Sequence, residues 1–204
     1  MKKLLSLFCI CLVLFTLSAC STSEQPTNEN TSIPDVSGSA EHHVLVAYFS
    51  ATGNTKSVAG TIANCTNATL YEITPETPYS DEDLDYNNDN SRTSIEMNDP
   101  NARPAISGSV INMENYDTIF LGYPIWWGEA PRIINTFLEA YNFSGKTIIP
   151  FCTSGGSSIN SSAAELESLT EGATWLDGQR FNRTSTREEM TEWINALNLG
   201  LQTA

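Results

Sequence analysis

The sequence predicts an α/β domain with a doubly wound, five-stranded parallel sheet and helices on both faces. From residue 42 onward, apolar segments typical of strands alternate with segments of helical periodicity. The first strand, at 43–50, is a continuous apolar run, as expected of a central strand covered on both faces. Three of the predicted strands end in loops of unusual composition, and doubly wound sheets bind their ligands at this edge.

The amino-terminal half contributes two strands, one helix and a long irregular segment. His-Val-Leu-Val-Ala-Tyr-Phe-Ser at 43–50 is followed by a turn at 51–53 and a helix at 54–64, and a short second strand spans 68–73. Between residues 74 and 104 the pattern dissolves into proline, asparagine, aspartate and serine, with a cluster of acids from Asp81 to Asp89. This segment is expected to be a long loop or a partly helical excursion.

The second half regains the alternation. Residues 117–123 and 147–152 are the third and fourth strands, and a weaker fifth strand at 174–181 is interrupted by Gly178. One helix begins at Pro131, the position that proline favours, and a capping box at Ser185 and Glu188 opens the last helix, which runs to about residue 199. Another helix is expected at 161–169. One face of the helix at Pro131 carries Ile133, Ile134, Phe137, Leu138 and Tyr141.

The charge of the chain argues against nucleic-acid binding. Ten Lys and Arg residues stand against 24 Asp and Glu in 204 residues, which gives a formal charge of −14. A protein that binds phosphate backbones needs a basic surface, and the few basic residues here are scattered. A partner attracted by charge is therefore expected to be basic, although acidity also simply favours solubility.

Residues 1–19 have the organisation of an export signal. Lys2 and Lys3 precede a mostly apolar run from Leu4 to Leu17, which is shorter than the roughly 20 residues of a membrane-spanning helix. Leu-Ser-Ala-Cys, ending at Cys20, closely resembles the processing signal of bacterial lipoproteins. The resemblance implies cleavage before Cys20 and a diacylglycerol on its sulfur. An ordinary secretory cleavage site followed by a free cysteine is the alternative.

The segment after Cys20 is expected to be a linker. Residues 21–41 are rich in Ser, Thr, Asn and Glu and lack aromatic side chains, so they cannot bury a core. The interpretation is a lipidated cysteine and flexible linker at 20–41 and a folded domain at 42–204. The domain would then lie outside the cytoplasm, tethered to a bacterial membrane.

The loop after the first strand has the chemistry of a phosphate site. Ser50-Ala-Thr52-Gly53-Asn54-Thr55 runs directly into a helix, whose amino end presents unpaired N–H groups and a partial positive charge. Hydroxyl groups would complete the site, and Gly53 would let the backbone approach. A well-capped helix start with no ligand is the alternative.

Two further loops are expected at the same edge. Tyr123-Pro124-Ile125-Trp126-Trp127-Gly128 offers an indole as a stacking surface for a planar ring. Which of the two tryptophans stacks is left open, with Trp127 expected to have the larger effect on a bound ring. Thr153-Ser154-Gly155-Gly156 has two glycines that would bring backbone N–H groups against a ligand. Loop aromatics that merely cover a helix end are the alternative for the tryptophans.

These three loops resemble those of the flavodoxin family over most of residues 43–199. Ser-x-Thr-Gly-Asn-Thr is similar to the family's FMN phosphate loop, and Tyr-Pro-Ile-Trp-Trp-Gly is similar to the loop that contacts the isoalloxazine. The resemblance implies strand order 2-1-3-4-5 and non-covalent FMN. It implies that Thr52 to Thr55 hold the phosphate, and that Tyr123 to Gly128 together with Thr153 to Gly156 hold the ring.

One departure from the family leaves the function open. Electron-carrier flavodoxins of the short type usually stack a tyrosine of the third loop on the flavin, and residues 153–158 contain no aromatic side chain. The expected function is an electron carrier with a basic redox protein as partner. The alternatives are an FMN-dependent NAD(P)H:quinone-type oxidoreductase with a small quinone-like acceptor, and a surface protein that binds no flavin.

Other kinds of site have little support. His42 and His43 are the only histidines, so neither a catalytic triad nor a histidine-rich metal site is expected. The acidic run at 81–89 lacks the glycine and closing glutamate of a calcium loop. Cys65 and Cys152 are expected at opposite edges of the sheet, too far apart for a disulfide, so both are predicted to be free thiols.

Overall fold

The computed structural model describes residues 43–201. The expected leader at 1–19, the lipidation site Cys20 and the linker to residue 41 lie outside the described residues. Within them, no helix is long and apolar enough to cross a membrane.

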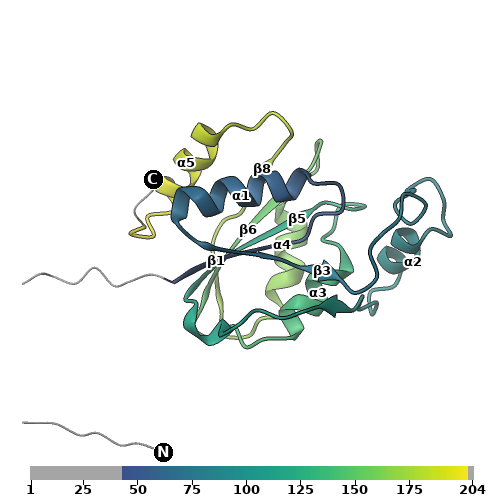
Figure 1. Ribbon diagram of the computed structural model, residues 1–204, viewed down its shortest axis with the longest axis horizontal. Helices are drawn as coiled ribbons and strands as arrows, with labels where there is room; N and C mark the ends of the chain where they lie inside the picture. Colours follow the sequence, from purple (N-terminus) through teal and green to yellow (C-terminus); the bar gives the residue numbers. More distant parts are fainter. Residues whose placement is uncertain (1–42, 202–204) are drawn as a thin grey trace, which may run out of the picture. The chain divides into compact units, whose positions relative to one another are not determined.

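The central sheet is parallel and has the predicted strand order (Figure 1). Its path is β2-β1-β5-β6-β7, and β8 pairs with β6 beyond the end of β7. If β7 and β8 are taken as one interrupted strand, this is the order 2-1-3-4-5, so the predicted fold class is confirmed. The strands are β1 (Val44–Tyr48), β2 (Thr69–Glu72), β5 (Thr118–Pro124), β6 (Thr147–Thr153), β7 (Thr174–Trp175) and β8 (Gln179–Phe181).

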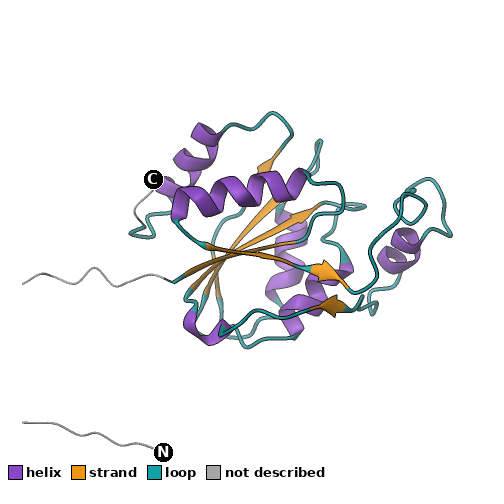
Figure 2. Ribbon diagram, in the orientation of Figure 1, coloured by secondary structure: helices purple, strands orange, loops and turns teal. Residues whose placement is uncertain are grey.

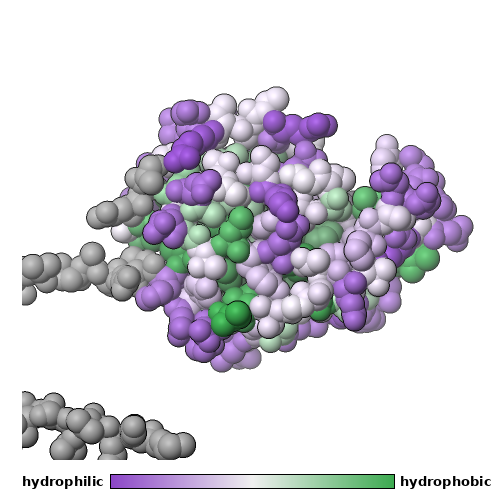
Figure 3. Space-filling view, viewed as in Figure 1, coloured by the Kyte–Doolittle hydropathy of each residue, from purple (hydrophilic) through white to green (hydrophobic). Residues whose placement is uncertain are grey.

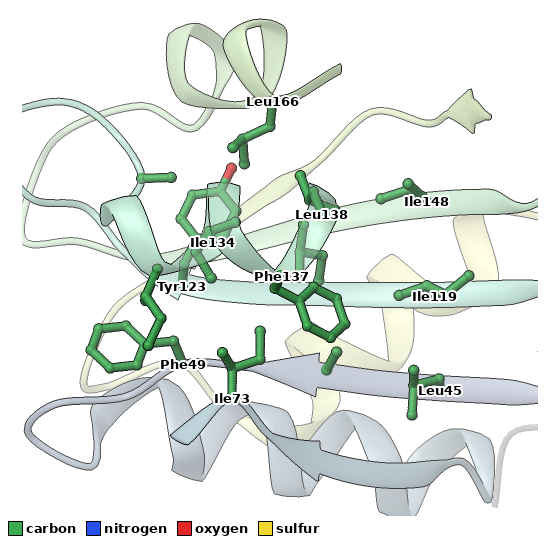
Figure 4. Close-up of a cluster of buried hydrophobic side chains, with 14 of the residues drawn as sticks. Leu45, Phe49, Ile73, Ile119, Tyr123, Ile134, Phe137, Leu138, Ile148 and Leu166 are labelled. Carbon is green, nitrogen blue, oxygen red and sulfur yellow. The ribbon is translucent and has the colours of Figure 1, made fainter. Parts of the chain in front are cut away.

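Helices cover both faces of the sheet because the side chains of each strand alternate between the faces (Figure 2). In β1, Leu45 and Ala47 join the buried cluster that includes α3, whereas Val46 and Tyr48 join the cluster that includes α1 and α5. Figure 4 shows the first cluster, where Phe137 and Leu138 of α3 lie against side chains of the sheet. The main helices are α1 (Asn54–Thr66), α3 (Arg132–Glu139), α4 (Asn160–Glu167) and α5 (Arg187–Ala196).

The fifth strand and the last helix differ in detail from the prediction. A Cβ atom on Gly178 would lie 2.7 Å from the carbonyl oxygen of Pro150, so only glycine fits where the chain passes close to β6 between β7 and β8. The capping box of α5 lies one residue later than expected. The Thr186 hydroxyl accepts from the Glu189 amide, and the Glu189 carboxylate accepts from the Thr186 amide.

The acidic excursion, residues 74–107, is an ordered insertion. It is closed by the antiparallel pair β3 (Thr74–Pro75) and β4 (Ile106–Ser107), carries α2 (Arg92–Asn98), and is followed by a 3-10 turn, η1 (Met113–Asn115). Its surface is mainly hydrophilic (Figure 3). Two arginines fix it to α3. The Arg132 guanidinium donates to the Met97 carbonyl at 3.0 Å, and Arg103 forms a bidentate pair with Glu139. The excursion is therefore a fixed wall of the domain.

Cys65 and Cys152 are both buried free cysteines, which confirms the prediction. Cys65 lies in the last turn of α1, at the end of the helix away from the carboxyl edge of the sheet, and its sulfur lies 3.5 Å from the Thr191 hydroxyl.

Candidate functional site

A cleft of about 870 Å³ lies at the carboxyl edge of the sheet, where the three predicted loops meet. This volume falls within the range of about 300–1,000 Å³ that is usual for small-molecule and cofactor sites. All three predicted loops contribute, and so do the excursion and the segment between β8 and α5. The predicted site residues in its lining are Ser50, Thr52, Gly53, Asn54, Thr55, Pro124, Ile125, Trp126, Thr153, Ser154 and Gly155.

Helix α1 opens on this cleft without a side-chain cap. Its N-cap residue, Gly53, has a left-handed backbone (φ 83°) and no side chain to accept from the first-turn amides. By contrast, Ser91 caps α2 and Thr186 caps α5. The amide groups that begin α1 therefore lack the partner that a capping side chain would give, and they are available to an anion.

Hydroxyl groups surround the start of α1. The Ser50 Oγ is buried and has no hydrogen-bond partner among the described residues. The Asn54 side chain donates through its Nδ2 to the Thr52 Oγ1 at 3.0 Å, which links these two side chains in the turn. A buried hydroxyl without a partner is costly, so the Ser50 Oγ indicates a group that completes this site.

Thr55 joins the first loop to the third. Its Oγ1 lies 2.7 Å from the Oγ1 of Thr153, and the two residues are 1% and 9% exposed. This contact explains why Thr55 is buried although it sits in the first turn of a helix. Its hydroxyl is therefore chiefly a structural link between two walls of the cleft.

The structure separates the two tryptophans. Trp126 lines the cleft, and its ring meets Phe49 and Tyr79 edge-on at centroid distances of 5.5 and 5.6 Å. Trp127 is 53% exposed, does not line the cleft and has a positive φ of 48°. Trp126, rather than Trp127, is therefore placed to stack on a ligand in the cleft. Gly128 also lies outside the lining, with a φ of 91° that completes the turn.

The third loop uses its own side chain to satisfy its amides. The Ser154 Oγ accepts from the Gly156 amide at 3.1 Å and from the Ser157 amide at 2.7 Å. Gly156 does not line the cleft, so its predicted amide contact with a ligand is not supported. Arg180 of β8 holds this loop from behind, donating to the Ser154 carbonyl at 3.2 Å.

The side chain of Tyr123 points into the core, which corrects its place in the predicted site. The residue is fully buried, and its hydroxyl lies 3.2 Å from the Ser162 Oγ of α4 (Figure 4). Burial raises the pKa of this phenol. Strand alternation places Tyr123 on the α3 and α4 face, and its pairing partner Cys152 joins the same cluster. Burial raises the pKa of the Cys152 thiol to about 12, so it stays protonated at neutral pH.

Two parts of the cleft were absent from the predicted site. The excursion contributes Leu84, which no pattern in the sequence indicates as a site residue. The segment after β8 contributes Asn182, Arg183, Thr184 and Ser185, and α5 contributes Arg187. The strand-end rule that selected the other three loops applies here as well, because this segment follows the fifth strand.

The electrostatic character of the cleft is opposite to that of the chain. Two arginines line it, and the lining contains no aspartate or glutamate among the described residues. The chain as a whole carries −14. A cleft free of carboxylates in so acidic a protein favours an anionic ligand.

Comparisons with known proteins agree with this geometry. A family model described as flavodoxin matches residues 43–197. No curated protein shows significant similarity to the chain. Among solved structures, a protein from Bacteroides eggerthii DSM 20697, provisionally designated a flavoprotein, is 45% identical with a TM-score of 0.73. The match covers 77% of this chain and 98% of that one.

Two other solved structures show the same architecture. A similarly designated protein from Bacteroides uniformis ATCC 8492 is 46% identical with a TM-score of 0.73, over 76% of this chain and 98% of that chain. A flavoprotein in complex with FMN from Lactobacillus acidophilus NCFM is 24% identical with a TM-score of 0.54, over 68% of this chain and 93% of that chain. Because this family model matches more than half of the chain, residues 43–197, the chain belongs to the flavodoxin family.

Proposed function

We propose that this protein binds FMN in the cleft and transfers electrons. The observation that carries the proposal is the uncapped amino end of α1, which opens on a cofactor-sized cleft lined by no described carboxylate. Membership of the flavodoxin family and the likeness to an FMN complex support the identity of the cofactor.

The residues present fit the phosphate of FMN. The first-turn amides of α1 have no capping side chain, and the Ser50 Oγ needs a partner. A dianionic phosphate satisfies both, because it accepts several hydrogen bonds and is stabilised by the helix dipole. Thr52 and Asn54 would add side-chain contacts. Thr55 would contribute through its backbone amide, since its hydroxyl is paired with Thr153.

The part of the cleft formed by the loops after β5 and β6 fits a planar ring. Trp126 is held edge-on between Phe49 and Tyr79, so its orientation is fixed before a ligand arrives. Pro124, Ile125 and the segment from Thr153 to Gly155 would form the rest of this wall. When bound, FMN supplies one- and two-electron redox chemistry, and the chain supplies its position and its electrostatic surroundings.

The electron carrier is favoured over the reductase by charge. The cleft lining holds two arginines and no described carboxylate, but the chain as a whole carries a net charge of −14. A strongly acidic surface outside the cleft attracts basic proteins and accelerates their docking, so a basic redox partner is proposed. One feature favours the reductase. Residues 153–158 carry no aromatic side chain, so the third loop supplies no ring to cover the flavin, and the excursion lines the cleft with Leu84. A small quinone-like acceptor is the proposed substrate in that case.

We also propose export and lipid anchoring, on the basis of the amino-terminal sequence. Lys2 and Lys3, the apolar run to Leu17 and the Leu-Ser-Ala-Cys motif ending at Cys20 support this placement. Expression of the full chain with radiolabelled palmitate tests it. The protein is expected to carry the label and to fractionate with membranes. Cys20→Ser should abolish both properties, and an unlabelled wild-type protein would contradict the anchor.

The experiment that tests flavin binding is an ultraviolet–visible spectrum of the purified protein, followed by titration of the flavin-free form with FMN. The bound form is expected to show flavin absorption in the visible range and strong fluorescence quenching. Absence of visible absorption together with no response to added FMN would refute the proposal. Stopped-flow mixing with NADH and NADPH then separates the functions, because rapid bleaching without a partner protein would refute the pure carrier.

A further inference from the structure

Almost every basic side chain of the domain has an identifiable role in holding the fold. Lys56, Arg92, Arg103 and Arg132 form ion pairs with Glu72, Glu96, Glu139 and Glu129. Lys146 donates to the carbonyls of Glu114 and Tyr116, and Arg180 donates to the Ser154 carbonyl.

Arg183 is different. Within residues 43–201 its side chain forms neither an ion pair nor a hydrogen bond, although acids far outnumber bases in this chain. It is exposed, and it lines the cleft. Arg187, the first residue of α5, lines the cleft as well. The Arg183 guanidinium, which forms no ion pair and faces a cleft lined by no described carboxylate, is suited to an incoming anion.

Hydrogen bonds hold the segment that carries Arg183 in one conformation. The Asn182 side chain accepts from both the amide and the hydroxyl of Thr184, at 2.8 and 2.7 Å. The Ser185 Oγ accepts from the Asn182 amide at 3.1 Å. Just beyond, the Thr186 and Glu189 capping box fixes the start of α5. These bonds reduce the entropy that the segment would lose on holding a ligand.

This segment and the uncapped helix end share one cleft. Helices α1 and α5 lie on the same face of the sheet (Figure 1). Residues Ser57, Val58 and Thr61 of α1 line the cleft together with Thr184 and Ser185, so the lining continues from the first turn of α1 to the segment after β8. The amides of α1 and the guanidinium of Arg183 are thus two positive features of a single cleft.

We propose that Arg183, with Arg187 beside it, forms the cationic wall of a phosphate monoester site whose other wall is the amino end of α1. The inference rests on the proposed function in taking FMN as the natural source of the phosphate. It goes further in assigning phosphate recognition to a fourth loop and to a charged side chain, in addition to the neutral phosphate turn.

The test compares Arg183→Gln with a matched control, Lys56→Gln. Lys56 has the same charge and lies on α1, but it is paired with Glu72 and does not line the cleft. FMN and riboflavin are titrated into each flavin-free protein, at low salt and again at high salt. Arg183→Gln is expected to raise the Kd for FMN about fivefold, the size expected for an exposed charge contact, and to leave riboflavin unchanged. Lys56→Gln should leave both affinities unchanged.

Salt gives a second readout. Added salt should weaken FMN binding more in the wild type than in Arg183→Gln, because the variant has lost a screened charge contact. Equal FMN affinities of wild type and Arg183→Gln would overturn the proposal, as would a parallel loss of riboflavin affinity.

Inorganic phosphate separates this proposal from the proposed function. If the wild type binds no FMN, the proposed function fails, and the rise of Tm with added phosphate decides the site. The proposed phosphate site is supported if phosphate raises the Tm of the wild type and not that of Arg183→Gln. It is refuted if phosphate changes the Tm of the two proteins equally. Far-UV circular dichroism of each variant verifies that the fold is intact.

Discussion

Thr55→Val should destabilise the flavin-free domain even though Thr55 lies at a predicted ligand site. Its Oγ1 is 2.7 Å from the Oγ1 of Thr153, and both residues are buried. Valine has nearly the shape of threonine, so the packing changes little and the loss is chiefly that of the hydrogen bond. The Thr153 hydroxyl is left buried without this partner, which costs about 1–3 kcal/mol. Thr153→Val should cost a similar amount for the same reason.

The double variant distinguishes this bond from simple packing. Thr55→Val with Thr153→Val removes both hydroxyls and leaves neither orphaned, so its cost should be less than the sum of the single costs by about 1 kcal/mol. The assay is urea unfolding, with thermal melts as a second readout. For a domain of this size each kcal/mol corresponds to about 2–4 °C in Tm. Thr52→Val is the control, because it removes only the solvent-exposed hydrogen bond from Asn54 and leaves no buried hydroxyl orphaned, so it should lower the stability far less. Strictly additive single costs would refute the coupling.

Three other outcomes follow from buried or cleft-lining groups. Trp126→Leu should relieve the quenching of bound flavin fluorescence more than Trp127→Leu, since Trp126 lines the cleft; the reverse order would contradict this. Cys152 should resist a thiol reagent at pH 8 until the protein unfolds. The pKa of its thiol is raised to about 12 from a usual value near 9. Between about pH 9 and 12 the thiol ionises in the unfolded protein but stays protonated in the folded one, so the stabilisation that the protonated thiol gives the fold is full below pH 9 and is lost across this range. Fast labelling of the native protein at this position would argue against the burial. Gly178→Ala should lower the free energy of unfolding by about 1–3 kcal/mol, because the new Cβ would lie 2.7 Å from the Pro150 carbonyl oxygen; an unchanged urea midpoint would show that β8 can shift at no cost.

The fold class followed from local patterns because those patterns are set by burial. Continuous apolar runs such as 44–48 and 118–123 are needed where a strand is covered on both faces, and the spacing of apolar residues in α3 is that of one buried helical stripe. The fifth strand was less clear because its geometry depends on a non-local contact. Gly178 lies against Pro150, which is far away in the sequence.

The candidate site divides in the same way. The start of α1 was found from composition, because a glycine and hydroxyls before a helix determine which amides stay unpaired. Composition could not tell Trp126 from Trp127. Their difference depends on the positive φ of Trp127 and on Phe49 and Tyr79, which come from other segments.

Residue types and spacing determined the alternation of strands and helices, the edge of the sheet where the loops form a cleft, and the helix start that we propose holds a phosphate. The packing of segments that are far apart in the sequence determined which other side chains lie in the core and which line the cleft. Strand alternation and α4 drew Tyr123 into the core, and the docking of the excursion brought Leu84 to the cleft. The segment that connects β8 to α5 brings Arg183 to the cleft as well. A local pattern indicates which residues are exposed and which are buried, whereas the side chain that a residue packs against depends on contacts between residues far apart in the chain.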